Sequence, residues 1–135
     1  MKSILFDSYA ILKYVEDEAG ADQVERLLRS ASEDSTKAYM SEINLGEVYY
    51  LAIRRIGLQA AKAHLEQVRQ LPIQVVSPTT DLIMRASEVK AEYAISYADC
   101  FAVATALEYE AAIITGDPEF KKLEKNEDVS IAWLK

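Results

Sequence analysis

Carboxylates stand at four places in this 135-residue chain where the neighbouring residues predict the end of a strand or the start of a helix. Asp7 and Asp117 each follow a short apolar run, Glu47 lies about a turn into a predicted helix, and Asp99 lies in the first turn of another. If these side chains meet, their charges repel and the pKa of each rises unless a cation offsets the repulsion. Carboxylate oxygens are hard ligands that favour Mg²⁺ or Mn²⁺ over zinc. A cluster of these side chains would therefore be a candidate metal site.

Five short apolar runs are the predicted strands that must position these carboxylates. They cover residues 4–6, 37–40, 73–76, 112–115 and 129–134, and segments with helical spacing separate most of them. Strands that alternate with helices predict an α/β fold, with a parallel sheet, helices on both faces and right-handed crossovers. Strand ends and the helix N-termini that follow them face the same crevice in such folds. The four carboxylates are therefore expected to converge at one edge of the sheet.

Several local predictions follow from residue type alone. The run at residues 4–6 predicts a strand buried on both faces, and Ser8 after it is a favourable helix N-cap. Ser96, with Asp99 three residues later, resembles a capping box. Residues 30–35 are polar and residues 121–128 are charged, so both segments are expected to be solvated.

Each carboxylate also has a structural explanation that needs no metal. Asp7 can cap a helix, and Asp99 is a favourable charge at a helix N-terminus. Asp117 suits the turn of Gly116-Asp117-Pro118, and Glu47 can be a solvated helix residue. For any single carboxylate this explanation is the simpler one. Only their joint arrangement indicates a metal site.

Composition excludes several other classes of protein. Half of the residues are hydrophobic and 27% are charged, as in ordinary soluble domains. No apolar run approaches the roughly 20 residues that cross a membrane, and the first residues lack a signal-peptide pattern, so a cytoplasmic protein is expected. The net charge of −7 argues against binding nucleic acid by bulk electrostatics alone. With His64 as the only histidine, a two-histidine ribonuclease is impossible, and Cys100, the only cysteine, is expected to be buried.

Four segments occur together in an order and spacing that is typical of one family. They are Phe6-Asp7-Ser8, Asn44-Leu45-Gly46-Glu47-Val48, Ser96-Tyr97-Ala98-Asp99-Cys100-Phe101-Ala102 and Thr115-Gly116-Asp117-Pro118-Glu119-Phe120. With them the chain resembles, over essentially its whole length, the PIN-domain ribonucleases, and most closely the VapC toxins of toxin–antitoxin pairs. Any one segment is a weak signal, whereas four acidic segments in this order are a strong one.

The resemblance implies a single PIN domain over residues 1–135, a three-layer α/β/α sandwich around a parallel sheet in strand order 3-2-1-4-5. It also implies Mg²⁺- or Mn²⁺-dependent cleavage of RNA phosphodiester bonds. VapC-like proteins are typically dimers, neutralised by an antitoxin whose tail enters the acidic groove. The positions that match the metal-binding, catalytic acids of the family are Asp7, Glu47, Asp99 and Asp117, and those that match supporting residues are Ser8 and Thr115.

Some alternatives stay open at this point. Glu42 is a second acid on the helix of Glu47, but it precedes Glu47 by five positions, so the two lie on different parts of the helix surface. The motif match favours Glu47. A PIN-like module that holds metal or a partner without cutting RNA is the alternative function. A dehalogenase-like phosphatase is disfavoured because Tyr9 stands where that class has a second Asp. A response-regulator receiver is disfavoured because Asp7 stands alone at its strand end and Thr115-Gly116 lacks the Lys that this class has after a late strand.

Basic residues must hold the RNA if this acidic chain is a ribonuclease. The candidates that flank the helices of the predicted site are Lys13, Lys37, Arg54 and Arg55. Any one of them is more simply explained as part of a solvated helix face.

Overall fold

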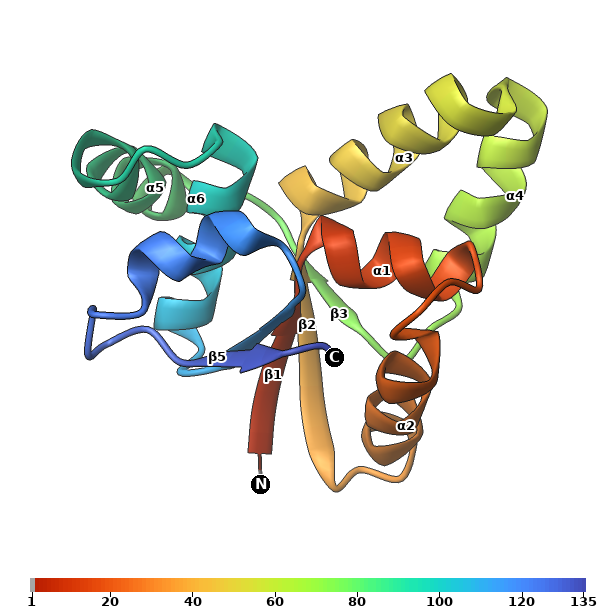
Figure 1. Ribbon diagram of the computed structural model, residues 1–135, viewed down its shortest axis with the longest axis horizontal. Coiled ribbons are helices and arrows are strands. Elements are labelled where there is room, and N and C mark those ends of the chain that lie inside the picture. The colour runs from red at the N-terminus through yellow and green to blue at the C-terminus, as the bar shows by residue number, and fades with distance from the viewer. Residues whose placement is uncertain (1) are drawn as a thin grey trace.

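The computed structural model describes residues 2–135, which form a five-stranded parallel sheet between two layers of helices (Figure 1). The strands are β1 (Lys2–Phe6), β2 (Thr36–Ser41), β3 (Gln74–Val76), β4 (Ala112–Thr115) and β5 (Ile131–Trp133). They lie in the order β3-β2-β1-β4-β5, and every neighbouring pair is parallel. The predicted α/β/α sandwich and its strand order 3-2-1-4-5 are therefore confirmed.

The helices separate into two groups, one on each face of the sheet (Figure 1). The helices are α1 (Ser8–Val15), α2 (Ala21–Ser32), α3 (Glu42–Ile56), α4 (Leu58–Arg69), α5 (Thr80–Glu92) and α6 (Tyr97–Glu108), with a 3₁₀ helix η1 (Pro118–Leu123). Helices α1 to α4 contribute to the core on one face. Helices α5 and α6, together with η1, build the core on the other face.

Strand β1 lies in the centre of the sheet and is buried on both sides, as predicted. Ile4 and Phe6 point into the core under α1 to α4, whereas Leu5 points into the core under α5 and α6, and all three are fully buried. The chain turns in opposite directions from this centre, through β2 and β3 on one side and β4 and β5 on the other. The point between β1 and β4 is thus the topological switch point, where open α/β sheets bind ligands beyond the strand ends.

Three predicted segments differ from the structure. The helical spacing of apolar residues after Ser8 predicts a helix to about Glu18. Instead, α1 ends at Val15, and Asp17 has a left-handed φ of 51° that a helix cannot continue. Helix α2 runs to Ser32, into the segment expected to be a loop, because buried Ala31 continues its apolar face. The segment 121–128 is not solvated throughout, since Leu123 at the end of η1 is fully buried, as is Phe120 before it.

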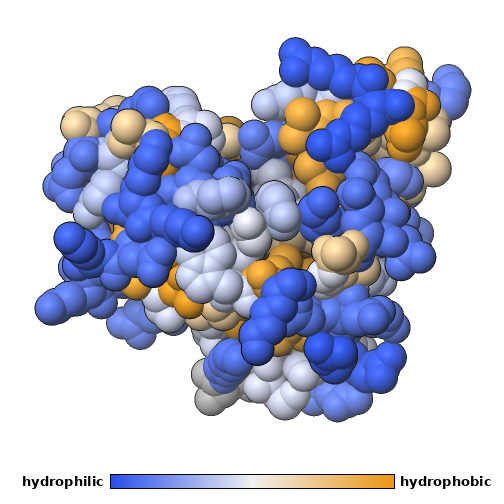
Figure 2. Space-filling view, viewed as in Figure 1, coloured by the Kyte–Doolittle hydropathy of each residue, from blue (hydrophilic) through white to orange (hydrophobic). Residues whose placement is uncertain are grey.

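The surface is mainly hydrophilic, with hydrophobic side chains gathered where α3 joins α4 (Figure 2). Ile56 and Leu58 lie at this junction and are each about 45% exposed. Among residues 2–135, no helix combines the length and apolar character needed to cross a bilayer.

Candidate metal centre

A cavity of about 310 Å³ lies beyond the carboxyl ends of β1 and β4. All four predicted acids, Asp7, Glu47, Asp99 and Asp117, line it, and so does Glu119. Ser8 lines it as well, whereas Thr115 is fully buried beneath it. Asp7 and Asp117 are 110 positions apart in the chain, yet both line this cavity.

Asp7 occupies the deepest position of these carboxylates and is held by hydrogen bonds to both of its oxygens. Its Oδ1 accepts from the backbone N–H of Ala10 at 2.9 Å, so Asp7 caps α1. The prediction that Ser8 is the cap is wrong, because Ser8 is already the first residue of the helix. The Thr115 hydroxyl donates to Asp7 Oδ2 and accepts from the backbone N–H of Asp117 at 3.0 Å. Thr115 thus joins the strand ends that carry two of the acids.

Glu47 is positioned by a buried polar group that joins three helices. The Ser8 hydroxyl donates to Glu47 Oε1, and Asn44 Nδ2 donates to Ser8 Oγ and to the carbonyl oxygen of Ala98, each at 3.2 Å. Asn44 is fully buried, and its Oδ1 has no hydrogen-bond partner among residues 2–135. The contacts of Asn44 link the starts of α1, α3 and α6, and this fixes the helix ends that carry Glu47 and Asp99.

Asp99 lies in the first turn of α6, where Ser96 caps the helix. Ser96 Oγ accepts from the backbone N–H of Asp99 at 3.1 Å, which confirms the half of the capping box that the serine supplies. The Asp99 side chain is turned to the cavity instead of completing the box. It remains only 8% exposed.

Burial and mutual repulsion raise the pKa values of the two least exposed acids. Desolvation raises the pKa of Asp7 to about 7, against the opposing hydrogen bonds from Thr115 and Ala10, and the charges of Asp99 and Asp117 add to the rise. Desolvation likewise raises the pKa of Asp99 to about 7, and the charges of Asp117, Glu47 and Glu119 contribute. In the metal-free protein the ionised forms of these two acids are therefore disfavoured, and a bound cation would relieve this cost.

The lining has the chemistry of a magnesium or manganese site, but it is not a closed cage. Its candidate ligands are all oxygen atoms, and neither His64 nor Cys100 lines the cavity. Within the described residues, no three His, Cys, Asp or Glu side chains already form a group that could hold an ion. The acids are therefore less closely grouped than in the shared cluster that the sequence predicts. Because Mg²⁺ keeps several waters and takes only one or two carboxylates directly, a cavity lined in this way still fits it.

The charged lining also contains one acid that the sequence analysis does not name as a site residue and one of its four basic candidates. Glu119, two residues after Asp117, adds a fifth carboxylate, and Arg55 is the only basic side chain that lines the described cavity. Glu42 lies elsewhere, beside Gly46 and Tyr49 in a different depression, as its spacing from Glu47 indicates. The acidic run around position 117 was a usable signal for Glu119, whereas nothing in the sequence distinguishes Arg55 from Arg54.

Gly116 is required by the close approach of Tyr9, which also lines the cavity. A Cβ atom built on Gly116 would stand 2.6 Å from Tyr9 Cε1, closer than side-chain atoms tolerate. The glycine between Thr115 and Asp117 therefore leaves room for the tyrosine ring at the wall of the cavity.

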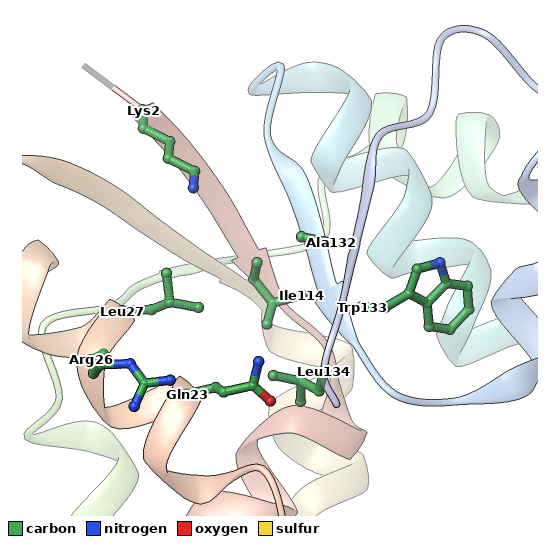
Figure 3. Close-up of a pocket in the computed structure, with 8 residues that line it drawn as sticks. All are labelled: Lys2, Gln23, Arg26, Leu27, Ile114, Ala132, Trp133 and Leu134. Atoms are coloured by element: carbon green, nitrogen blue, oxygen red, sulfur yellow. The ribbon is translucent and has the colours of Figure 1, made fainter.

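A second cavity, of about 210 Å³, lies between α2 and the C-terminal end of the chain (Figure 3). Its lining residues are Lys2, Gln23, Arg26, Leu27, Ile114, Ala132, Trp133 and Leu134. The lining contains two basic side chains but no carboxylate, imidazole or thiol, so it offers a hard cation no charged ligand, only the amide oxygen of Gln23. Of these two cavities, only the acid-lined one contains the acids that the sequence predicts for a metal site.

Comparison with known proteins agrees with this architecture. A family model described as PIN domain matches residues 4–126. A search of curated proteins finds no match.

Several solved structures share the fold. They include DNA-bound VapBC from Salmonella typhimurium, with 16% identity, 100% coverage of both chains and a TM-score of 0.77. VapBC2 from Rickettsia felis, bound to a promoter fragment, has 12% identity, 98% and 99% coverage of this chain and that chain, and a TM-score of 0.76. VapC20 from Mycobacterium tuberculosis, described as a toxin that cleaves the sarcin–ricin loop, has 22% identity, 90% and 95% coverage, and a TM-score of 0.71.

Proposed function

Because this chain belongs to the PIN domain family, we propose that it is a metal-dependent endoribonuclease that acts as the toxin of a toxin–antitoxin pair. The proposal includes residues 1–135 as one such domain and Asp7, Glu47, Asp99 and Asp117 as its metal-binding, catalytic acids. The observation that carries it is the lining of one cavity, at the switch point of the sheet, by all four acids. The solved VapC structures of the same fold support the proposal.

Three of the four acids can be assigned different parts in this chemistry. A bound Mg²⁺ or Mn²⁺ ion would lower the pKa of a water molecule and stabilise charge on the leaving oxygen of a phosphodiester. Asp7, rigidly held through Ala10 and Thr115, is suited to hold the ion directly. Glu47, which Ser8 orients, and Asp99 are suited to orient the attacking water or the ion's waters. No side chain needs to form a covalent bond to phosphorus.

A second candidate function is a PIN domain that binds a partner or a metal without cutting RNA. The observation that favours it is that no group of three carboxylates already encloses an ion site within the described residues. The presence of all four matched acids, with Asp7 and Asp99 held nearly out of solvent, favours the enzyme. Burying acids is costly, and a domain that only binds a partner protein gains nothing evident from it.

The partners of this function are an RNA substrate, a cognate antitoxin and a second copy of the chain. Structures of the same fold include a toxin–antitoxin complex from Klebsiella pneumoniae and a member of the VapBC family of toxin–antitoxin systems, and this supports the antitoxin as a partner. The exposed apolar side chains at the junction of α3 and α4, Ile56 and Leu58, are of the kind that a partner covers. A toxin that acts on RNA in this way would work in the cytoplasm.

The metal requirement tests the enzyme directly. Purified protein is incubated with a mixture of RNAs in Mg²⁺ or Mn²⁺, and a matched sample contains excess chelator. We expect discrete cleavage products with metal and none with chelator, because the acids alone cannot stabilise charge on the leaving oxygen. Equal RNA decay in both samples would point to contamination or a metal-free route. No cleavage in either sample, combined with metal binding in calorimetry, would favour the non-cutting module.

A matched pair of substitutions on α3 tests the choice between its two acids. Glu47→Gln is expected to lower the cleavage rate by about 10- to 100-fold, since it removes a charge that lines the cavity but keeps an oxygen for Ser8. Glu42→Gln removes the same charge from the same helix outside this cavity and should leave the rate near that of the unchanged protein. The initial rate on one RNA at saturating Mg²⁺ is the measurement. The reverse ranking would move the site to Glu42.

A further inference from the structure

Helices α1 and α3 present facing stripes of side chains along the acid-lined cavity. In each stripe the residues are four apart, which places them on one face of the helix. The stripes are Ser8, Leu12 and Glu16 for α1 and its C-cap, and Glu47, Leu51 and Arg55 for α3. At one end Ser8 donates to Glu47, and at the other Arg55 Nη1 donates to both carboxylate oxygens of Glu16, at 2.7 and 3.0 Å. The cavity thus continues from the acids along the helix pair as a groove.

The two partners of the distant ion pair differ in what they face. Arg55 lines the cavity together with Leu12 and Leu51, whereas Glu16 does not. Five carboxylates and this one basic side chain make up the charged lining. An RNA strand that presents one phosphate to the acids brings further phosphates into the same negative field, where like charges repel. A cation in the groove would offset that repulsion for one of them.

Arg55 lies too far along the helix to share the reacting phosphate with Glu47. The two residues are eight positions apart, which corresponds to about 12 Å along a helix axis. Its contact would therefore be with a phosphate further along the strand. Leu12 and Leu51 lie between the two ends and give the intervening wall an apolar surface.

Releasing Arg55 from Glu16 costs little. The Arg55 side chain is 51% exposed and that of Glu16 is 21% exposed, and solvent screens an ion pair at the surface so that it adds little net stability. Both contacts use Nη1, and within residues 2–135 no partner is found for Nε or Nη2. A guanidinium can offer two parallel N–H donors to the oxygens of one phosphate. Arg55 can therefore take up a phosphate by exchanging one carboxylate for it.

We propose that Arg55 is a substrate-positioning residue that binds a non-reacting phosphate of the RNA at the far end of this groove. In the free protein Glu16 holds the guanidinium of Arg55 in place. When RNA binds, the Glu16 carboxylate and the RNA phosphate compete for that guanidinium. The inference rests on the proposed function for the nature of the ligand, an RNA strand. It adds to that function a specific contact outside the metal centre.

Binding of an uncut RNA isolates this contact from the chemistry. In the Asp7→Asn background, the dissociation constant of a fluorescently labelled single-stranded RNA is measured by anisotropy over a series of salt concentrations. Arg55→Gln is expected to weaken binding about tenfold and to reduce the salt slope by about 0.7, the loss of one single-strand phosphate contact. Arg55→Lys should restore part of the affinity. Glu16→Gln, which frees the guanidinium, should bind as tightly as the Asp7→Asn parent or more tightly.

Arg54→Gln is the matched control, because it removes the neighbouring charge from outside the cavity. The Arg54 guanidinium lies over the ring of Tyr50, 5.1 Å from its centroid, and does not line the groove. In the chain that retains Asp7, Arg55→Gln should raise KM and leave kcat nearly unchanged, whereas Arg54→Gln should change neither.

Two results would overturn the inference while the ribonuclease stands. Equal weakening by Arg55→Gln and Arg54→Gln would reveal only a general charge effect. Equal weakening by Arg55→Gln and Glu16→Gln would identify the pair as a clamp between helices. Failure of the proposed function is distinct, because it would appear as uncut RNA in the chain that retains Asp7, whatever the binding series shows.

Discussion

Asp7→Asn is expected to abolish RNA cleavage while the fold is retained. Asn is as good a helix cap as Asp, and its side-chain oxygen can still accept from the backbone N–H of Ala10. The amide can face the Thr115 hydroxyl, which would then accept from it. What the substitution removes is the charge with which Asp7 would hold the metal ion. Since changes in residues outside the ligand set alone cost about 10- to 100-fold, we expect a loss of more than about 100-fold.

The measurement is the initial cleavage rate at saturating Mg²⁺, with circular dichroism and thermal unfolding of the same preparation to verify the fold. Asp22→Asn is the matched control, because it removes the same charge at an exposed position in the first turn of α2, away from the cavity. Cleavage by Asp7→Asn within about threefold of the control would remove Asp7 from the catalytic site.

The metal-free protein should become less stable as the pH rises from about 4 to about 7. In the folded state the pKa values of Asp7 and Asp99 are raised to about 7, from 3.8. Between these values the folded protein retains protons that the unfolded chain has lost, so the free energy of unfolding falls as the pH increases. Above the folded pKa both states are ionised and the whole penalty remains, on the order of 4 kcal/mol for each of the two groups taken alone.

The double variant Asp7→Asn with Asp99→Asn isolates this effect, since other carboxylates contribute to the pH profile of both proteins. Urea unfolding in the presence of chelator should find the double variant more stable at pH 8, with a difference that shrinks towards pH 5. Saturating Mg²⁺ should narrow the difference at pH 8, because an ion that binds only the folded state stabilises it. Parallel pH profiles for the two proteins would contradict the raised pKa values.

The main features of the fold could be predicted from local patterns. The apolar run before Asp7 is short and bounded by a carboxylate, and such a run is stable only when it is covered on both faces, as Ile4, Leu5 and Phe6 are. The alternation of strands and helices predicts the parallel sheet, and parallel topology brings strand ends to one edge. The approach of Asp7 and Asp117 to one cavity follows from these rules.

Which side chains complete the cavity was decided by tertiary contacts. Asn44 links Ser8 to the backbone of α6, and Arg55 rather than Arg54 turns into the groove. Arg54 and Arg55 are adjacent residues of the same type, so the sequence does not distinguish them. Only the packing of α3 against α1 decides which of the two side chains faces the groove. Similarly, η1 is too short for its amphipathic pattern to be detected in the sequence. That Phe120 and Leu123 are buried follows only from their packing with α6 and the sheet.

The sequence by itself determined which residues are acidic, which segments are strands and helices, and therefore at which edge of the sheet the carboxylates lie. These properties depend on neighbours along the chain, whose preferences act over a few residues. The tertiary structure alone decided the spacing between the carboxylates, the direction of each hydrogen bond and the raised pKa values of Asp7 and Asp99. Desolvation and Coulomb repulsion depend on distance through space, and that distance exists only after the helices have packed on the sheet.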